Sequence, residues 1–301
     1  MTKKIVPAVF IGFLAADLIL FLVAPRYFAA LHRWLFYPSE CSLTELIAEV
    51  KPEHTASAAA ALPILERTES GLDLWETPRG KWWTVHGDNA LQFLIYEQLK
   101  DIYEPLGHEI HKGDIVLDCG ANIGIFTRTA LSRGASLVVG IEPSPQTLNA
   151  FRRNFEKEIR EGRVVAYPKG VWDHDAEMDL SVDEAFQARD SLVLPQGGPV
   201  PKIRVPLTTI DELVAELKLP RVDFIKMDIE GAEKPAIKGA EKTIKRFRPR
   251  MSLSSEHLKD DFTAIPALVH SIEPNYTHRG CDCSNIQKRI KALVLAFDPI
   301  S

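Results

Sequence analysis

The residues best suited to chemistry are acidic side chains that follow strand-like runs of the sequence. Asp118 lies near the end of the run 114–119, and two glycines, Gly120 and Gly124, lead from it into a helical pattern. Glycines allow a backbone to approach a ligand closely, and the exposed amides of the following helix can bind a carboxylate. Glu142 ends the next strand-like run, where an acid that binds ribose hydroxyls is expected. Together these residues indicate a nucleoside-binding turn.

Two details of this turn distinguish between nucleoside ligands. A dinucleotide site requires the pattern G-x-G-x-x-G, whereas Gly120, Asn122 and Gly124 give only G-x-N-x-G. Asp118 would also repel a pyrophosphate, but it suits a ligand that carries positive charge. S-adenosylmethionine carries an ammonium and a sulfonium, so that Asp118 and Gly120 suit its methionine end and Glu142 suits its ribose. We therefore predict S-adenosylmethionine as the cofactor; the alternative is an ordinary strand-to-helix turn with a coincidental acid.

A second charged cluster ends the strand-like run 222–227. Because side chains alternate along a strand, Lys226 and Asp228 share one face and can point toward the same crevice. Asp228, at the carboxyl end of a central strand, is the predicted catalytic base. His257 ends the adjacent strand and is a second catalytic candidate, although a surface-loop role fits it equally well. Lys226 is predicted to hold Asp228 ionised or to stabilise an alkoxide, and a structural salt bridge is the alternative for this pair.

Further acidic residues lie in the same region. Glu230 and Glu233 are expected in the first turn of a helix, where the helix dipole stabilises carboxylates without any function. Asp228, Glu256 and His257 could hold a divalent ion, but the sequence shows no recognisable metal spacing. We therefore assign no metal ligand.

The chain has four cysteines, Cys41, Cys119, Cys281 and Cys283. They are too few and too irregularly spaced for a secreted disulfide framework, which favours a reducing compartment. With His278, the last two form H-x-x-C-x-C, which could bind zinc or form a strained local disulfide. A four-ligand zinc site would need another ligand from elsewhere, so free loop cysteines are the favoured interpretation.

These motifs resemble those of the FkbM-type family of S-adenosylmethionine-dependent methyltransferases. The resemblance covers roughly residues 85–280 and rests on the following segments: Gly113-Asp114, Asp118-Cys119-Gly120-Ala121-Asn122-Ile123-Gly124, Gly140-Ile141-Glu142-Pro143-Ser144, Thr208-Thr209-Ile210-Asp211-Glu212-Leu213 and Asp223-Phe224-Ile225-Lys226-Met227-Asp228-Ile229-Glu230-Gly231-Ala232-Glu233. The resemblance implies O-methyl transfer to a hydroxyl group of a sugar or natural product rather than to any particular acceptor. The predicted cofactor site then consists of Asp118, Gly120, Asn122, Gly124, Glu142, Pro143 and Gly170.

Strand-like and helical runs alternate along this part of the chain. Strands are expected at 114–119, 136–141, 164–167, 202–205, 222–227, 251–254 and 292–297, and helices at 123–132, 146–159, 209–217, 232–245 and 260–272. Such alternation requires parallel pairing through right-handed crossovers, and these sheets bind ligands at the carboxyl ends of their strands. The pattern and the resemblance predict a class I methyltransferase fold: an α/β, Rossmann-like, doubly wound and mostly parallel sheet with an antiparallel last strand. Residues 113–301 would form this domain, and 71–112 its N-terminal extension.

The N-terminal run 5–24 contains Asp17 as its only charge. As a helix it would be about 30 Å long, enough to cross the hydrocarbon core of a bilayer. We therefore predict a transmembrane or membrane-anchoring helix over 1–25 and a juxtamembrane helical connector over 26–70; a cleaved signal peptide and a buried core helix are the alternatives. Basic residues flank both ends and leave the orientation open. Because S-adenosylmethionine is made in the cytosol, a single-pass protein with a cytoplasmic catalytic domain is expected.

Composition narrows the choice of partners. With 46% apolar and 26% charged residues, the chain has the composition of a folded globular protein and not of a disordered one. Its 41 acidic and 36 basic residues give a net charge of −5, which provides no global attraction to a nucleic acid. We predict a small-molecule or lipid-linked hydroxyl acceptor, a membrane and no nucleic acid as partners. Ala8, Gly12 and Ala16 could pair two N-terminal helices in a homodimer, but chance spacing of small residues is the favoured explanation.

The predicted function is therefore methyl transfer from S-adenosylmethionine to a hydroxyl group at a membrane. The alternative from another class is a catalytically silent, membrane-anchored adaptor that keeps the fold to bind the cofactor or a partner. Retention of both the glycine turn and the Asp228 cluster argues against it. An NAD-dependent oxidoreductase fails on the missing third glycine.

Overall fold

The computed structural model describes residues 64–300 except 69, 195–198, 287 and 288, together with the isolated positions 31, 35, 41, 45 and 46. The chain divides into two compact units, Met1–Glu53 with Arg279–Leu293, and His54–His278 with Val294–Ser301. Every predicted cofactor and catalytic residue belongs to the second unit.

The predicted membrane anchor over 1–25, including the small-residue spacing at 8–16, lies outside the described residues. No helix in the described part of the chain is both long and apolar enough to span a membrane. The predicted connector over 26–70 is described mainly at its end, where β1 (Ile64–Arg67) pairs antiparallel with β2 (Leu72–Thr77). The helical interpretation is wrong for this stretch, because the neighbouring strand supplies its backbone partners.

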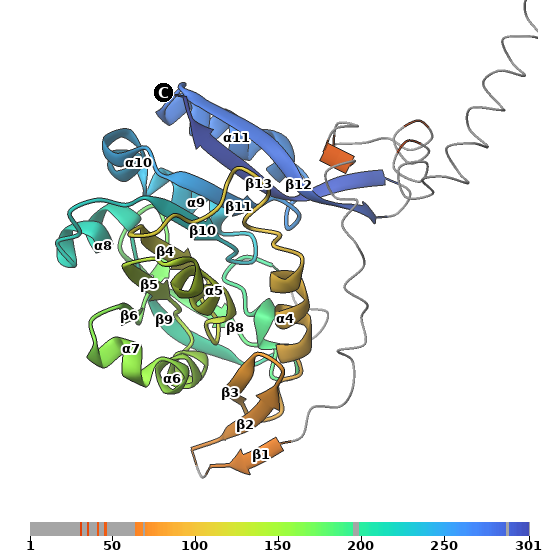
Figure 1. Ribbon diagram of the computed structural model, residues 1–301, viewed down its shortest axis with the longest axis vertical. Coiled ribbons are helices and arrows are strands. Elements are labelled where there is room, and N and C mark those ends of the chain that lie inside the picture. The colour runs from red at the N-terminus through yellow and green to blue at the C-terminus, as the bar shows by residue number, and fades with distance from the viewer. Residues whose placement is uncertain are drawn as a thin grey trace, which may run out of the picture. The chain divides into compact units, whose positions relative to one another are not determined.

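A seven-stranded sheet forms the centre of the α/β architecture (Figure 1). In spatial order its strands are β12 (Tyr276–Ile286), β13 (Arg289–Pro299), β11 (Arg250–Ser254), β10 (Phe224–Met227), β4 (Ile115–Cys119), β5 (Leu137–Ile141) and β6 (Val164–Tyr167). The five strands from β11 to β6 are parallel, and β13 runs antiparallel to β11. The predicted mostly parallel sheet with an antiparallel last strand is confirmed.

Helices pack on both faces of this sheet (Figure 1). They are α4 (Leu91–Leu99), α5 (Ile125–Arg133), α6 (Pro145–Asn154), α7 (Glu156–Arg160), α8 (Ile210–Glu216), α9 (Glu233–Lys238), α10 (Glu241–Phe247) and α11 (Asp261–Ile272). Alternate strand residues such as Leu117 and Ile225 join the apolar faces of α8 to α11 in one core cluster. A second cluster joins α4, α6 and the hairpin of β2 and β3 (Gly80–Val85) around Phe151. The sheet is therefore buried on both sides, as its apolar strands require.

Two predicted helices are interrupted. The run 146–159 forms α6 and α7, separated at Phe155, whose φ of −124° and ψ of 23° are not helical. The run 232–245 forms α9 and α10, separated at Gly239 and Ala240. A Cβ at Gly239 would lie 2.0 Å from the backbone oxygen of Trp172, so this break allows a close approach of two chain segments. By contrast, Thr209 caps α8 as predicted, because its side chain accepts the amide of Glu212 at 3.0 Å.

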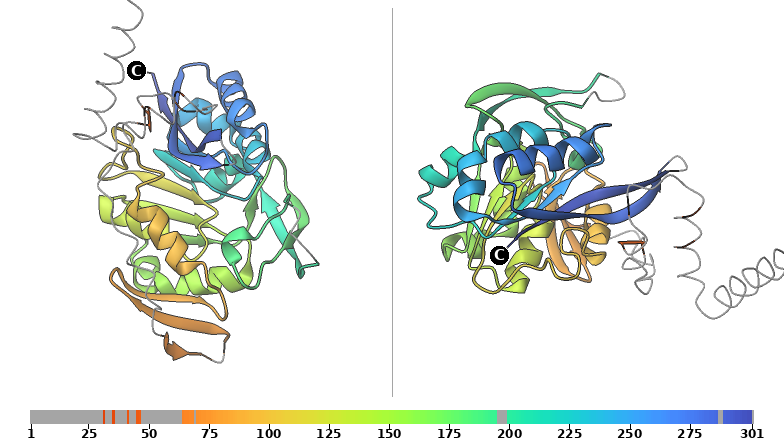
Figure 2. Two further views of the ribbon diagram at one scale, coloured as in Figure 1. Left: turned by 90° about the vertical axis from the view of Figure 1, so that its right-hand side faces the viewer. Right: turned by 90° about the horizontal axis from the view of Figure 1, so that it is seen from above.

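One predicted strand belongs to a different sheet. The run 202–205 lies in β9 (Lys202–Thr208), which pairs with β7 (Gly170–Val171) and antiparallel with β8 (Ala176–Ser181) in a separate three-stranded sheet. Figure 2 shows β8 and β9 beside the main sheet. Exposed and buried residues alternate through most of β9. This pattern is typical of a strand with one solvent-exposed face, and not of a central strand in a sheet that is buried on both faces. The interpretation of this run as part of the doubly wound sheet is therefore wrong.

Candidate functional site

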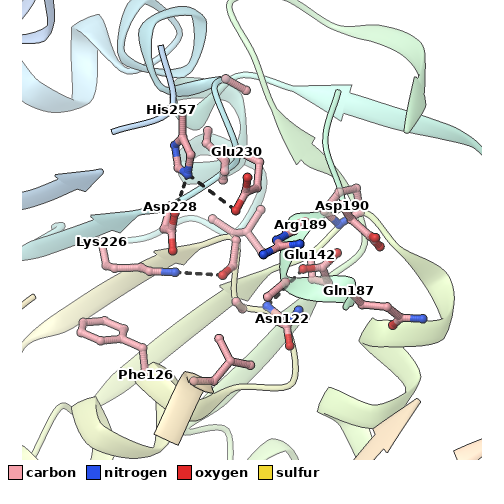
Figure 3. Close-up of a pocket in the computed structure, with 18 of the residues that line it drawn as sticks. Asn122, Phe126, Glu142, Gln187, Arg189, Asp190, Lys226, Asp228, Glu230 and His257 are labelled. Carbon is pink, nitrogen blue, oxygen red and sulfur yellow. Dashed lines mark hydrogen bonds and ion pairs between the residues drawn. The ribbon is translucent and has the colours of Figure 1, made fainter. Parts of the chain in front are cut away.

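A cavity of about 670 Å³ lies at the carboxyl ends of β4, β5 and β10. Its size is within the range of small-molecule pockets, roughly 300–1,000 Å³. Figure 3 shows side chains from these strand ends and from the segment between β8 and β9 converging on it. Eight of the ten predicted site residues line the cavity: Gly120, Asn122, Glu142, Pro143, Gly170, Lys226, Asp228 and His257. The structure thus brings the two predicted clusters together in one site.

Asp118 and Gly124 are not among the residues that line the cavity. The Asp118 side chain is fully buried, where Thr127 donates to its Oδ2 at 2.7 Å. Its Oδ1 lies 3.4 Å from Nζ of Lys226, the residue that faces it in the register of β4 and β10. Gly124 precedes α5 with a φ of +96°, and a Cβ there would lie 2.1 Å from the ring of Phe155. Both residues therefore hold the glycine turn in place from outside the cavity.

Lys226 contacts both the buried Asp118 and the backbone of the glycine turn, and it lines the cavity. Its buried ammonium donates to the backbone oxygen of Gly120 at 2.9 Å and to that of Cys119 at 3.4 Å. It also lies 5.2 Å from the centre of the Tyr103 ring. Burial alone would lower the pKa of Lys226, but the carboxylates of Asp118 and Asp228 raise it overall. Lys226 therefore stays cationic and fixes the glycine turn.

The glycine turn packs directly against the second cluster. Gly120 has a φ of +76°, and a Cβ at this position would lie 1.9 Å from the backbone oxygen of Asp228. The amide of Asp228 in turn donates to the backbone oxygen of Cys119 at 3.1 Å. A side chain at position 120 would therefore displace the catalytic candidate, which explains the glycine on packing grounds.

Glu142 ends β5 with both carboxylate oxygens held by backbone amides. Oε2 accepts from Asn122 at 3.1 Å and Oε1 accepts from Ser144 at 2.9 Å. Burial raises the pKa of Glu142 to about 7, although these two amides oppose the shift. Each carboxylate oxygen can accept a second hydrogen bond, so the group is positioned to bind ligand hydroxyls.

Asp228 is held by an unpredicted residue, Tyr103. The Tyr103 hydroxyl donates to Oδ2 of Asp228 at 2.7 Å. Burial alone would raise the pKa of Asp228, but Lys226, His257 and the Tyr103 hydroxyl lower it overall. The pKa of Asp228 therefore lies below its ordinary value, which keeps the carboxylate ionised at neutral pH.

His257 lies among three carboxylates. Its Nδ1 is 3.2 Å from Oε1 of Glu233, and its Nε2 is 3.6 Å from both Oδ1 of Asp228 and Oε1 of Glu230 (Figure 3). Burial alone would lower the pKa of His257, but the carboxylates raise it to about 12. The protonated His257 side chain compensates the negative charge of these three carboxylates. Glu230 and Glu233 therefore contact a buried cation in addition to lying near the start of a helix. One ligand atom each of Asp228, Glu233 and His257 also lies within 4.8 Å of the others, close enough for a metal ion.

Sequence reasoning missed the cavity residues contributed by irregular segments. Tyr103 lies before the first motif, and Gln187, Arg189 and Asp190 follow β8 without any recognisable pattern. Gln187 is 4% exposed, and the buried Oδ2 of Asp190 has no hydrogen-bond partner in the part of the chain that the structure describes. No sequence signal marks these residues, because only the tertiary fold brings their segments over the strand ends.

Cys281 forms no disulfide, as the favoured interpretation predicts, but it is buried in β12 and does not lie in a loop. Cys119 is likewise a buried thiol outside any disulfide, whereas Cys41 is disulfide-bonded. The side chain of Cys283 lies outside the described residues, so the zinc interpretation of His278, Cys281 and Cys283 stays an alternative. Among the described residues, the only group of potential metal ligands is the one around His257.

The strand order, the antiparallel β13 and a cavity at the carboxyl ends of the parallel strands define a class I methyltransferase-like α/β domain. The family model described as the methyltransferase FkbM domain matches residues 118–282, more than half of the chain. The chain belongs to this family and is a methyltransferase that uses S-adenosylmethionine, as the sequence predicted.

Three proteins illustrate this similarity. The chain is 28% identical over 180 residues to the 31-O-demethyl-FK506 methyltransferase FkbM of Streptomyces tacrolimicus, covering 50% of this chain and 68% of that protein. It is 24% identical over 140 residues to the hexuronic acid methyltransferase AglP of Haloferax volcanii, covering 46% and 55%. The crystal structure of methyltransferase FkbM from Methylobacillus flagellatus matches with 20% identity and a TM-score of 0.46, covering 69% and 53%. The chain thus spans little more than half of the last two proteins.

The cavity residues fit S-adenosylmethionine. Glu142 presents a carboxyl group that ribose hydroxyls could reach, and Asp190 presents a second one whose Oδ2 has no hydrogen-bond partner among the described residues. Two acidic side chains suit a ligand that carries hydrogen-bond donors, such as the hydroxyl and amino groups of a nucleoside. Asp118, however, lies beneath the cavity, and its predicted contact with the methionine end remains a prediction.

Proposed function

We propose that this domain transfers a methyl group from S-adenosylmethionine to a hydroxyl oxygen of an organic acceptor. The observation that carries the proposal is the position of Asp228, a carboxylate that lines the same cavity as Glu142 and is held ionised. A proton acceptor beside a nucleoside site is what a hydroxyl acceptor requires. The name of the Streptomyces relative denotes an oxygen position and that of the Haloferax relative a sugar acid, which supports a hydroxyl-bearing acceptor.

The cofactor-binding half of the site would consist of residues at the ends of β4 and β5. Glu142 would accept hydrogen bonds from the ribose hydroxyls, and the turn from Gly120 to Asn122 would contact the methionine part. Pro143 and Gly170 would flank the adenine. When bound, S-adenosylmethionine supplies a methyl group already activated by its sulfonium. The protein therefore has to align the acceptor oxygen and exclude water.

The catalytic half would remove the acceptor's proton. As the acceptor oxygen forms its bond to the methyl carbon, the carbon–sulfur bond breaks, its electron pair stays on sulfur, and the hydroxyl proton passes to Asp228. A positioned base contributes about 10²- to 10⁴-fold to such a step. The Tyr103 hydroxyl holds this carboxylate, the charge of Lys226 lowers its pKa, and the protonated His257 lies 3.6 Å from its other oxygen. The structure therefore favours Asp228 over His257 as the base.

The acceptor would carry an apolar body beside its hydroxyl. Phe93 of α4 and Phe186 line the cavity with their ring centres 5.7 Å apart, and Leu192 and Leu194 line it as well. Phe93 remains 48% exposed, which is high for a large aromatic side chain. These residues favour a lipid-linked or otherwise apolar acceptor over a small free sugar. Such an acceptor also agrees with the apolar run 5–24 and the proposed action at a membrane.

The test uses S-adenosylmethionine with a radiolabelled methyl group and separate lipid and glycan extracts as acceptors. We expect label in one extract, and a loss of about 10²-fold or more in Asp228→Asn, while the affinity for S-adenosylhomocysteine changes less than about threefold. Glu177→Gln, an exposed acid on β8, is the matched control. Normal turnover in Asp228→Asn would show that the base is misassigned. Cofactor binding without any transfer would support the silent adaptor instead.

A further inference from the structure

Tyr103 links the catalytic candidate to polar groups that lie outside the cavity. Its hydroxyl donates to Oδ2 of Asp228 at 2.7 Å, yet the residue lies between α4 and β4, where the chain forms neither helix nor strand. Burial and then the charge of Asp228 raise the pKa of Tyr103 well above its ordinary value, so the hydroxyl keeps the proton that it donates. Its ring packs edge-on against Phe126 of α5, with the ring centres 5.6 Å apart. Because no helix or strand fixes the Tyr103 backbone, its position depends on contacts with side chains.

Ser252 provides one such contact to the backbone of Tyr103. It lies fully buried in β11, and its Oγ donates to the backbone oxygen of Tyr103 at 2.6 Å. In the register of the parallel strands, Ser252 is the neighbour of Lys226 on β10, and Lys226 is the neighbour of Asp118 on β4. Residues at the same level of neighbouring strands point to the same face of a sheet. The three side chains therefore form one buried polar row on the face that Tyr103 covers.

His108 holds the Ser252 hydroxyl in place. It is fully buried, with Nε2 3.1 Å from Oγ of Ser252 and Nδ1 2.7 Å from Oδ1 of Asp298 on β13. The single hydroxyl hydrogen of Ser252 is used on the carbonyl of Tyr103, because a carbonyl can only accept. Nε2 of His108 therefore carries a hydrogen and donates it to Oγ, an assignment that follows from the hydrogen-bond network. Donation thus runs from His108 through Ser252 to the backbone of Tyr103.

This network reaches the site only through Tyr103. His108, Ser252 and Asp298 are not among the residues that line the cavity, whereas Tyr103 is. Apolar side chains at these positions would avoid the cost of burying polar groups, but a satisfied buried network fixes the groups that it connects in one geometry. We propose that His108 and Ser252 are positioning residues, which hold the Tyr103 backbone so that its hydroxyl stays on Oδ2 of Asp228. This inference rests on the proposed role of Asp228 as the base.

Loss of this network should affect turnover and leave binding of the cofactor unchanged. Without the Ser252 hydroxyl, the Tyr103 backbone loses a buried donor, and its hydroxyl is held less firmly on the carboxylate. The base is then less often aligned with the acceptor hydroxyl, which lowers the rate of the chemical step. The contacts of Glu142 and of the glycine turn do not involve Ser252 or His108.

The first measurement needs no acceptor. The full chain is labelled with 3-fluorotyrosine, and the fluorine NMR signal of Tyr103 is identified by its absence in Tyr103→Phe. Asp228→Asn shows where this signal lies when the hydrogen bond to the carboxylate is lost. We expect Ser252→Ala and His108→Leu to move the signal toward that position. His108→Gln keeps an amide that can donate to Ser252, so its signal should stay near that of wild type. The control is Ser271→Ala, which removes a serine hydroxyl that donates to a backbone oxygen elsewhere.

The second measurement is turnover with the extract that accepts the labelled methyl group. Ser252→Ala should lower kcat about three- to tenfold, the equivalent of one hydrogen bond, with KM and the affinity for S-adenosylhomocysteine within about twofold of wild type. In the Tyr103→Phe background, the same substitution should lower kcat less than about twofold, because the hydroxyl through which Ser252 acts is already missing. His108→Gln should retain kcat within about threefold, whereas His108→Leu should behave like Ser252→Ala.

Circular dichroism checks the folding of each variant, and Ser252→Ala decides the test if His108→Leu fails to fold. An unmoved Tyr103 signal in Ser252→Ala would overturn the inference, as would a loss of kcat that is equally large in the Tyr103→Phe background. Lower stability with unchanged kcat would also overturn it, because the network would then serve only to satisfy buried polar groups. If no extract accepts the methyl group, the proposed function fails, while the fluorine signal still decides whether Ser252 and His108 hold Tyr103 on Asp228.

Discussion

Replacement of Lys226 by methionine should destabilise the domain strongly, because it leaves the Asp118 carboxylate buried without a counter-ion. Asp118 and Lys226 are 0% and 4% exposed, and their charged atoms lie 3.4 Å apart. Removal of one partner from a buried ion pair typically costs about 3–5 kcal/mol. Thr127 continues to donate to the other carboxylate oxygen of Asp118, so we expect a loss near the lower limit, about 3 kcal/mol.

The measurement is urea unfolding at pH 7, followed by circular dichroism, on Lys226→Met, Asp118→Asn and the double variant. In the double variant no carboxylate is left unpaired, so its destabilisation should be smaller than the sum of the two single losses by about 1–3 kcal/mol. A loss below about 1 kcal/mol in Lys226→Met, or strictly additive losses, would refute the argument that this pair supports the glycine turn.

The same variants test where Asp118 acts. Because Asp118 does not line the cavity, Asp118→Asn should bind S-adenosylhomocysteine within about threefold of wild type wherever the protein is folded. A large loss of affinity at unchanged stability would instead restore its predicted contact with the methionine end of the cofactor.

Four further predictions follow from the site geometry. Glu142→Ala should weaken S-adenosylhomocysteine binding by about 1.5–3 kcal/mol in calorimetry, because two ribose hydroxyls lose a carboxylate acceptor; unchanged affinity would show that the acid is misassigned. The pKa of Glu142 is raised from 4.5 to about 7, so ionisation of this carboxyl opposes folding. The free energy of unfolding should therefore fall as the pH rises from 4.5 to about 7. Glu142→Gln should remove this part of the pH dependence of stability. Gly120→Ala should lower the free energy of unfolding in urea by more than about 3 kcal/mol, because its Cβ would overlap the Asp228 backbone oxygen. The control Gly71→Ala has the same φ of +76° but no atom within 4 Å of the new Cβ, so it should lower the free energy of unfolding by only about 1–2 kcal/mol. Equal losses in the two variants would contradict the packing argument. Tyr103→Phe removes the donor to Oδ2 of Asp228 and should raise the pKa of that carboxyl, so the acid limb of the pH–rate profile should move to higher pH. An unmoved limb would separate Asp228 from the titrating base.

The sequence predicted most of the main sheet because each strand carries its own local signal. Residues 115–119 and 224–227 are wholly buried strands, and apolar runs of this kind bounded by turn residues are visible without any tertiary information. The same is true of the glycine turn and of Thr209, whose cap bonds a residue only three positions away. Strand β9 was assigned to the wrong sheet because a local pattern does not specify which strands pair.

For the catalytic candidates, too, the sequence predicted the strand positions but not the contacts between side chains. Strand periodicity places Lys226 and Asp228 on one face, and the structure confirms that both line the cavity. Periodicity could not show that the main ionic partner of Lys226 is Asp118, because that contact depends on the register of two strands more than 100 residues apart in the chain.

The sequence by itself determined the class of fold, the cofactor and the strand ends at which the site would form, since motifs of a few neighbouring residues encode these properties. Only the tertiary structure decided which groups touch. It placed the Tyr103 hydroxyl within hydrogen-bond distance of Asp228 and surrounded His257 with three carboxylates. It also brought Gln187 and Asp190 into the lining of the same cavity. The physical reason is that hydrogen bonds and ion pairs act over a few ångströms in space, whereas sequence patterns report only periodicity along the chain.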